Sequence, residues 1–390
     1  MKKKSFHLFL AALGFAAALS CQKTSVSATA DLSVEEGSGL MRVRFAQSLP
    51  STKIADGQME ENMINSVQLF IFTPDGVLEN SKYAFIEDQE PTSVVCSMRT
   101  KTGEGKTVYA LVNAPKLTKV GTLANLEATL SDLNDNTDDN LIMSGKRENV
   151  EVTDYTPYTG EPTEFVIYVK KLAAAVQLNK VRVNFLNTEL QGSTFKLKEF
   201  YLKNVVGRAP YGVATQGDGT ETAGIPLPLS NEDRTNKNYW YNKLTLESTP
   251  VYLTRDICNL NTQFISTGAP GNGATTVTVA RTLYAYPNAT VADPEDGGSA
   301  TVFSPRHTRL VLHGLISTGN NTTMSFSDKD FYYTFDLPQL EANKKYSITV
   351  NISMLGKEND NDDTKTTSGQ AQPTVTIVDW DDTIDIEYNM

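Results

Sequence analysis

The sequence has few cysteines and few histidines, and this scarcity argues against two kinds of protein. Its three cysteines are Cys21, Cys96 and Cys258. A secreted chain with two cysteines besides Cys21 has no disulfide framework, so we expect buried free thiols, with a Cys96–Cys258 pair as the alternative. Of the three histidines, only His307 and His313 lie beyond the first twenty residues. Two histidines are poor material for a metal site or a general-base cluster.

Positive charge is also scarce. The chain has 35 lysines and arginines against 46 aspartates and glutamates, a formal net charge of −11. Nucleic-acid binding requires a basic face, so this balance argues against a nucleic-acid partner. A net negative charge favours solubility at a crowded surface. It says nothing about catalysis.

The first twenty residues have the pattern of a secretory signal peptide. Three lysines at positions 2–4 precede an apolar stretch over residues 6–19, and small residues precede Cys21. The stretch is short for a membrane span, and polar residues follow it. A cysteine directly after the cleavage position resembles a bacterial lipobox, although Ala18 stands where such boxes favour leucine. We expect a lipid on Cys21; the alternative is an ordinary signal peptide with a chance cysteine.

After residue 30, short alternating or β-branched runs are separated by Gly, Asn, Asp and Pro. This pattern predicts an all-β protein built of sandwiches rather than a parallel α/β sheet. A break near Lys171 and Leu172 predicts two tandem domains with a packed junction, over residues 21–171 and 172–390. The clearest predicted strands are residues 66–72, 107–112, 164–169, 181–185, 195–202, 346–352 and 373–380.

One stretch has helical periodicity instead. Leucines at positions 123, 126, 130 and 133 are spaced like one face of a helix. This spacing predicts one short helix, or two helical turns, within residues 117–133. We expect the helix to cap one end of a sandwich.

No segment carries a recognisable catalytic constellation. Residues 103–107, GEGKT, resemble the end of a phosphate loop, but Thr100 stands where glycine is needed, and we interpret them as a hairpin turn. The acidic segments 132–138 and 358–363 are interpreted as solvated loops, since the first lacks the glycine of a calcium loop. Two histidines six residues apart on one strand would lie about 20 Å apart and could not share a metal. We therefore expect no enzyme, no metal and no cofactor.

The aromatic segment Tyr239-Trp240-Tyr241 has two interpretations. Exposed, such a trio could stack on a sugar ring and form a glycan platform. The alternative, which we favour, is a core or edge cluster in a strand.

Two segments have the features of interacting strands. The first is residues 39–47, in which Met41, Val43 and Phe45 share one face that must be buried. A polar stretch follows and contains Lys53-Ile54, a trypsin-like site where nicking is easy.

The second segment is near residue 390. Ile384, Ile386 and Tyr388 alternate with polar residues after a break at residues 381–383. A strand with one apolar face can add to a sheet edge of another subunit, which is the donor-strand mode of β-augmentation.

An ordered set of segments resembles the FimA-like family, the major fimbrillins of Bacteroidetes type V pili. Each motif is short, but together with the lipobox the set covers nearly the whole chain. The segments are LFIF at 69–72, VYALVN at 108–113, NLIMSG at 140–145, KLAAAV at 171–176, LYAYPN at 283–288, YSITV at 346–350 and VDW at 378–380.

The resemblance implies two transthyretin-like sandwiches with short helical insertions, and a route of assembly. The lipoprotein is exported to the outer membrane and carried to the cell surface. A trypsin-like maturation protease then removes the first strand with its lipid, and the open groove accepts a donor strand from an identical or related pilin. Here the cut maps to Lys53-Ile54, although family members are commonly cut after arginine; a cut at Arg44-Phe45 would split the strand itself.

Other roles stay open. A tip subunit of the same pilus need not donate a strand, and an anchor subunit keeps its lipid. A surface-anchored glycan-binding lipoprotein would use the aromatic trio at residues 239–241. For the fimbrium itself, the resemblance implies adhesion to a host or bacterial surface ligand.

Overall fold

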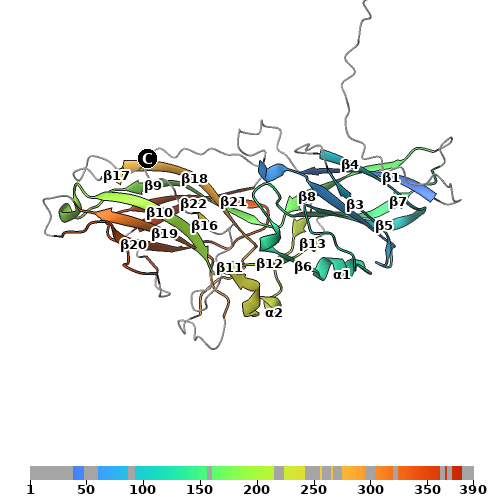
Figure 1. Cartoon of the computed structure of the whole chain (residues 1–390). Coiled ribbons are helices and arrows are strands. Elements are labelled where there is room, and N and C mark those ends of the chain that lie inside the picture. The colour runs from blue at the N-terminus through green and yellow to red at the C-terminus, as the bar shows by residue number, and fades with distance from the viewer. Residues whose placement is uncertain are drawn as a thin grey trace, which may run out of the picture.

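The computed structural model shows two β-rich bodies side by side (Figure 1). The expected all-β class is confirmed, because strands dominate and the described α-helices are short. None of the described helices is long and apolar enough to cross a membrane. The helices are α1 (Leu123–Ala128), α2 (Asn231–Arg234), and the 3-10 turns η1 (Glu60–Asn62), η2 (Leu133–Asp135), η3 (Thr188–Leu190) and η4 (Lys237–Tyr239). The structure describes residues 38–47, 60–86, 93–155, 160–214, 224–241, 255–256, 265–266, 275–294, 304–318, 324–360, 365–366 and 371–379.

The first body is a seven-stranded sheet of order β3-β2-β5-β7-β8-β1-β4. β7 and β8 pair only through Met143 with Lys171 and Ser144 with Lys170, so the sheet divides there into two layers. An apolar core fills the space between β3-β2-β5-β7 and β8-β1-β4, and we call this body the first sandwich. Its strands are β1 (Ser38–Gln47), β2 (Ser66–Phe72), β3 (Leu78–Phe85), β4 (Ser93–Lys101), β5 (Gly103–Val112), β7 (Met143–Val152) and β8 (Thr163–Lys171).

The second body, the second sandwich, has two sheets. One has the order β18-β9-β21-β22; the other has the order β16-β10-β19-β20, with β17 also pairing with β10. Leu178, Phe195 and Ile348 are among the fully buried residues of their shared core. The strands are β9 (Ala174–Val183), β10 (Thr194–Lys203), β16 (Arg255–Asp256), β17 (Ile265–Ser266), β18 (Thr275–Ala285), β19 (Arg309–Ser317), β20 (Lys329–Asp336), β21 (Lys344–Ile352) and β22 (Ala371–Asp379).

Short elements join the two bodies. β6 (Leu130–Asp132) is hydrogen-bonded to β12 (Arg208–Pro210), so segments far apart in sequence pair here. The Tyr109 hydroxyl on β5 donates to the backbone carbonyl of Tyr211 at 2.5 Å. One apolar cluster runs from the outer face of β2 and β5 into the second sandwich. The remaining strands are β11 (Val205–Val206), β13 (Val213–Ala214), β14 (Ile225–Pro226) and β15 (Trp240–Tyr241).

The predicted strands are present, with shifted ends. The largest shift is in β9, which begins at Ala174 rather than Val181 because residues 174–176 are buried and do not alternate. The helix prediction is confirmed by α1, which Thr122 caps through a hydrogen bond to the Asn125 amide; the later leucines lie in β6 and η2. The division of the chain into domains at Lys171 and Leu172 stays a prediction.

The interpretation of residues 103–107 as a hairpin turn is wrong. β4 pairs with β1, whereas β5 pairs with β2 and β7, so the chain crosses between layers here. Local sequence predicted a reversal of direction but not the partner of each strand, which distant residues determine.

Candidate subunit-interaction site

The strand β1 is the middle strand of the layer β8-β1-β4, and its inward face belongs to the core of the first sandwich. Met41, Val43 and Phe45 are fully buried, and they belong to the same core as the inward side chains of β2 and β5. Burying side chains of this size stabilises a fold by about 1.5–3 kcal/mol each. The inward face of β1 is therefore a substantial part of what stabilises this sandwich.

Both edges of β1 are paired. It runs antiparallel to β4, with Val43 opposite Cys96, and parallel to β8, with Val43 opposite Phe165. Among the described residues β4 has no other ladder partner. Withdrawal of β1 would leave a slot one strand wide, with open backbone on both sides and an apolar floor. Buried backbone groups need hydrogen-bond partners, so β1 satisfies groups on both of its neighbours.

A buried polar cluster ties the C-terminal end of β1 to the base of the second sandwich. The Gln47 amide donates to the carbonyl of Asn62 at 2.8 Å. The Lys171 ammonium, on a residue that is 1% exposed, donates to Asn62 Oδ1 at 2.8 Å and to Gln47 Oε1 at 3.3 Å. The backbone amide of Lys171 donates to Asn343, just before β21. Chain segments on either side of residues 48–59 therefore meet at one point, and after a cut between them only noncovalent contacts would hold β1 in the sandwich.

The outward face of β1 contributes little. Arg42 Nη1 lies 2.9 Å from Glu164 Oε1 on β8, but the two side chains are 49% and 59% exposed. Solvent screens such a pair, and exposed ion pairs contribute at most about 1 kcal/mol.

Cys96 lies on β4 opposite Val43 as a buried free thiol, as expected for this residue. Burial raises the pKa of the thiol, with the nearby Lys82 ammonium opposing it. A buried, protonated thiol behaves as a small apolar side chain.

Of the site residues predicted from the sequence, the structure describes those of β1. Met41, Val43 and Phe45 share one buried face, as the alternation predicted. β22, which precedes the predicted donor segment, is described as far as Asp379. The residues outside the described part are Cys21, Lys53, Ile54, Cys258, Ile384, Ile386 and Tyr388.

The glycan platform considered at residues 239–241 is wrong. Trp240 is 1% exposed, and its indole N–H donates to the carbonyl of Arg234 at 2.8 Å. The Tyr241 hydroxyl donates to Asp132 at 2.7 Å and accepts from the Asn134 amide at 3.0 Å. The large apolar indole is stabilised by burial, so this segment is part of the core.

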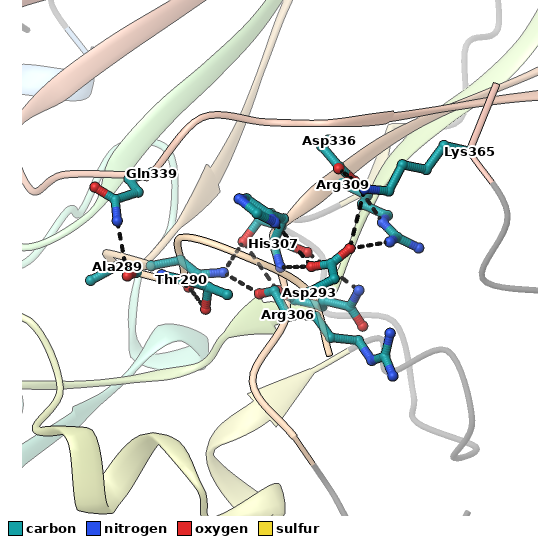
Figure 2. Close-up of polar contacts among 12 residues, drawn as sticks. Ala289, Thr290, Asp293, Arg306, His307, Arg309, Asp336, Gln339 and Lys365 are labelled. Carbon is teal, nitrogen blue, oxygen red and sulfur yellow. Dashed lines mark hydrogen bonds and ion pairs between the residues drawn. The ribbon is translucent and has the colours of Figure 1, made fainter. Parts of the chain in front are cut away.

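A polar cluster in the second sandwich gathers groups that the sequence keeps apart. Figure 2 shows Arg309 and Lys365 reaching Asp293 and Asp336. His307 Nδ1 lies 2.9 Å from Asp293 Oδ1, and Arg309 donates to Asp293 Oδ2 at 2.5 Å and to Asp336 Oδ1 at 2.8 Å. Burial alone would raise the pKa of Asp293, but hydrogen bonds from His307 and the charge of Arg309 hold this pKa well below its usual range.

The same cluster offers the ligand types of a metal site. Asp293, His307 and Asp336 present ligand atoms within 4.8 Å of one another. The charges of Arg309 and Lys365 already neutralise both carboxylates, which disfavours a further cation. These residues therefore form an ion network in which both carboxylates are already paired with cations. The sequence gives no sign of this network, because its residues lie on separate segments with no motif spacing.

The two histidines lie in separate networks. His313 Nδ1 lies 3.1 Å from Glu199 on β10, and its Nε2 lies 2.6 Å from Asp330 on β20. Its ring stacks on Tyr332 with the ring centroids 4.2 Å apart. His313 thus links three neighbouring strands rather than forming a site with His307.

Comparison with known proteins relates part of this chain to a family of fimbrial subunits. Residues 44–226 match the family model of the major fimbrial subunit protein (FimA). The family consists of structural subunits rather than enzymes. No curated protein matches the sequence.

Solved structures share the fold. A fimbrilin (FimA) from Porphyromonas gingivalis superimposes with a TM-score of 0.55 at 14% identity, covering 87% of this chain and 97% of that one. A candidate cell-adhesion protein from Bacteroides eggerthii gives 0.55 at 16% identity, covering 89% and 97%. Another, from Parabacteroides distasonis, gives 0.55 at 16% identity, covering 88% and 99%. At these identities the likeness establishes the fold alone.

Proposed function

We propose that this chain is a pilus subunit exported as a lipoprotein and polymerised by proteolysis-triggered donor-strand exchange. A lipid on Cys21 delivers the subunit to the outer membrane and the cell surface. Cleavage between Lys53 and Ile54 by a trypsin-like protease releases β1 together with the lipid. The C-terminal segment of the next subunit, with Ile384, Ile386 and Tyr388, then fills the slot.

The position of β1 carries this proposal. A strand at a sheet edge has one neighbour, so its loss unpairs one ladder only. β1 instead lies between β4 and β8 with its inward side chains fully buried. Its removal would expose an apolar floor and two rows of backbone groups, which provides the driving force for capture of another strand. We assign residues 21–171 to an N-terminal domain that accepts the strand and residues 172–390 to a C-terminal domain that supplies it.

Two related roles compete with a stalk subunit. A tip subunit accepts a strand without donating one, and an anchor subunit keeps Cys21 and its lipid. The anchored glycan-binding role loses its platform, because Trp240 is buried. Adhesion to a host or bacterial surface ligand is the function we assign to the assembled fimbrium.

Mild trypsin treatment of the full chain tests the proposal. We expect cleavage after Lys53, followed by ladders on gels that resist heating, because a filled slot dissociates slowly. Lys53→Gln should remain uncut at this position and monomeric. Monomers that persist after verified cleavage would contradict the proposal.

Removal of residues 384–390 tests the donor segment separately. Cleaved subunits that lack it should accept a strand but offer none, so ladders should not form from the truncated chain alone. Ile386→Asp is a smaller change with the same expected direction. Unchanged ladders would exclude this segment as the donor.

A further inference from the structure

Side chains of β3 bind the free edge of β4, although these strands stand at opposite ends of the sheet order. Lys82 Nζ donates to the carbonyl of Ser97 at 2.7 Å, and Asn80 Nδ2 donates to the carbonyl of Arg99 at 2.9 Å. Glu79 Oε1 accepts from the amide of Lys101 at 3.0 Å. We call Glu79, Asn80 and Lys82 the β3 clamp.

The bonded groups on β4 are two residues apart. Backbone groups of alternate residues in an antiparallel strand point to the same edge, so residues 97, 99 and 101 present one row. The other edge of β4 pairs with β1. The clamp therefore occupies the edge of β4 that no described strand pairs with, and it does so with side chains instead of a ladder.

Glu79 extends the clamp to a third strand. Its second carboxylate oxygen forms an ion pair with Lys106 on β5, and the Thr100 hydroxyl donates to the first. The side chains of Lys106 and Glu79 are 4% and 10% exposed. Burial would raise the pKa of Glu79, but the hydrogen bonds from Lys106, Thr100 and Lys101 lower it overall. This part of the clamp is thus a buried, charge-assisted contact.

The topology gives the empty slot a way to close. β4 is antiparallel to β1, and β1 is parallel to β8, so β4 is antiparallel to β8 as well. Without β1, β4 could move by one strand spacing, about 4.8 Å, and form a ladder with β8 directly. That ladder would satisfy the exposed backbone and leave no room for an incoming strand.

We propose that the β3 clamp keeps β4 away from β8 while the slot is empty, so that the slot stays one strand wide until a second copy of the chain fills it. Glu79, Asn80 and Lys82 are positioning residues, because they act on the slot through the backbone of β4. The inference rests on the proposed function, because it requires that β1 leaves.

A cysteine pair across the slot reports its closure. Cys96 on β4 and Phe165 on β8 both lie opposite Val43, so β1 or a replacement strand separates them by two strand spacings, about 10 Å. A disulfide needs Cα atoms within about 7 Å. In a full chain carrying Phe165→Cys and Cys258→Ser, oxidation after trypsin cleavage should join positions 96 and 165 only where β4 has moved onto β8.

The clamp variant for this test is Asn80→Ala with Lys82→Met, which removes both donors and spares the buried Glu79. Compared with the unmodified clamp, we expect about tenfold more 96–165 cross-link and about tenfold slower ladder formation, the effect of losing roughly one to two hydrogen bonds. Ser81→Ala, an exposed position between them, is the matched control and should change neither. Lys82→Met alone should act in the same direction with less disturbance.

Before cleavage, thermal unfolding of the clamp variant and the control should show that both fold with β1 in place. Equal cross-linking and equal ladder rates in the clamp variant and the control would overturn the inference. The two proposals fail differently. If cleaved protein with an intact clamp forms no ladders, donor-strand exchange is wrong, but the difference in cross-linking still decides whether the clamp keeps the slot open.

Discussion

β1 and β21 occupy equivalent places in the two sandwiches. β8-β1-β4 and β9-β21-β22 each have a middle strand that is parallel to one neighbour and antiparallel to the other. Both middle strands bury an apolar face completely: Met41, Val43 and Phe45 in β1, and Ile348 and Val350 among others in β21. Burial and pairing therefore do not distinguish them.

The covalent connections of β1 and β21 distinguish the two strands. β21 lies between β20 and β22 in the chain, so two cuts are needed to free it. β1 precedes every other strand of the first sandwich, and one cut within residues 48–59 separates it. If the proposed function holds, this single connection is what makes a strand of the core replaceable.

The third strands also differ. The outer edge of β4 is bonded by the β3 clamp, whereas β22 pairs only with β21 among the described residues. On β22, Ala371 is buried but Ile377 is 49% exposed. An edge strand paired on one side is held by one ladder instead of two. The outer edge of β4 is thus held by side chains of another strand, as the acceptor role proposed for the first sandwich would require.

The largest effect on stability is expected from truncating a buried side chain in the middle strand of each sandwich. Phe45→Ala should lower the free energy of unfolding of the uncleaved chain by about 3–5 kcal/mol, and Ile348→Ala by about 2–5 kcal/mol, since both leave cavities. In assembled fimbriae only Ile348→Ala should weaken the subunit, because the proposed assembly removes β1. Denaturant unfolding of both forms measures this, and equal weakening of fimbriae by Phe45→Ala would break the comparison.

The second prediction concerns the acid dependence of stability in the second sandwich, which depends on Asp293. Asp293 has a depressed pKa in the folded state, so its stabilisation is present above the unfolded value, about pH 4, and is lost as the pH falls through the folded value. Asp293→Asn should cost about 2–3 kcal/mol at pH 7, where the charge is lost, and should flatten the stability profile below about pH 4. The loss should be the same before and after assembly. Glu164→Gln, at an exposed carboxylate, is the control, and an unchanged acid profile in Asp293→Asn would contradict the assignment.

A third, smaller effect concerns the end of β1. Gln47→Ala removes one partner of the buried Lys171 ammonium and should destabilise the uncleaved chain by about 1–2 kcal/mol. After cleavage it should speed release of the β1 peptide about tenfold, as followed by chromatography of the freed peptide. Gln372→Ala, an exposed glutamine on β22, is the matched control. Equal release rates would mean that the cluster does not retain β1.

The smallest effect is expected at the outward face of β1. Arg42→Ala should change stability by less than about 1 kcal/mol, because both partners of its ion pair are largely exposed. Raising the salt concentration should erase the difference. A large loss of stability would show that the outward face, rather than the buried face, retains β1.

The sequence predicted most strands and the buried face of β1 correctly, because alternation is a local signal. Met41, Val43 and Phe45 could be assigned from their spacing alone. The order of the strands could not, since no local pattern says that β1 lies between β4 and β8. The same limit explains the error at residues 103–107, where the reversal was predicted but not the crossing between layers.

The polar contacts around the slot were also beyond local reasoning. Glu79 and Lys171 look like ordinary surface residues in sequence, and they acquire roles only when distant strands meet. Trp240 shows the opposite case: an aromatic segment is compatible with a platform or a core, and only its packing decides. Sequence therefore identified the buried face of β1 but not the polar residues that contact its neighbouring strands.

The most direct test of whether β1 is removed and replaced is mass spectrometry of the protein purified from fimbriae at the cell surface. We expect a mature N-terminus at Ile54, with no peptide from residues 21–53 and no lipid in the assembled subunit. Assembled subunits that retain Cys21 with its lipid, or the strand with Met41, Val43 and Phe45, would contradict it.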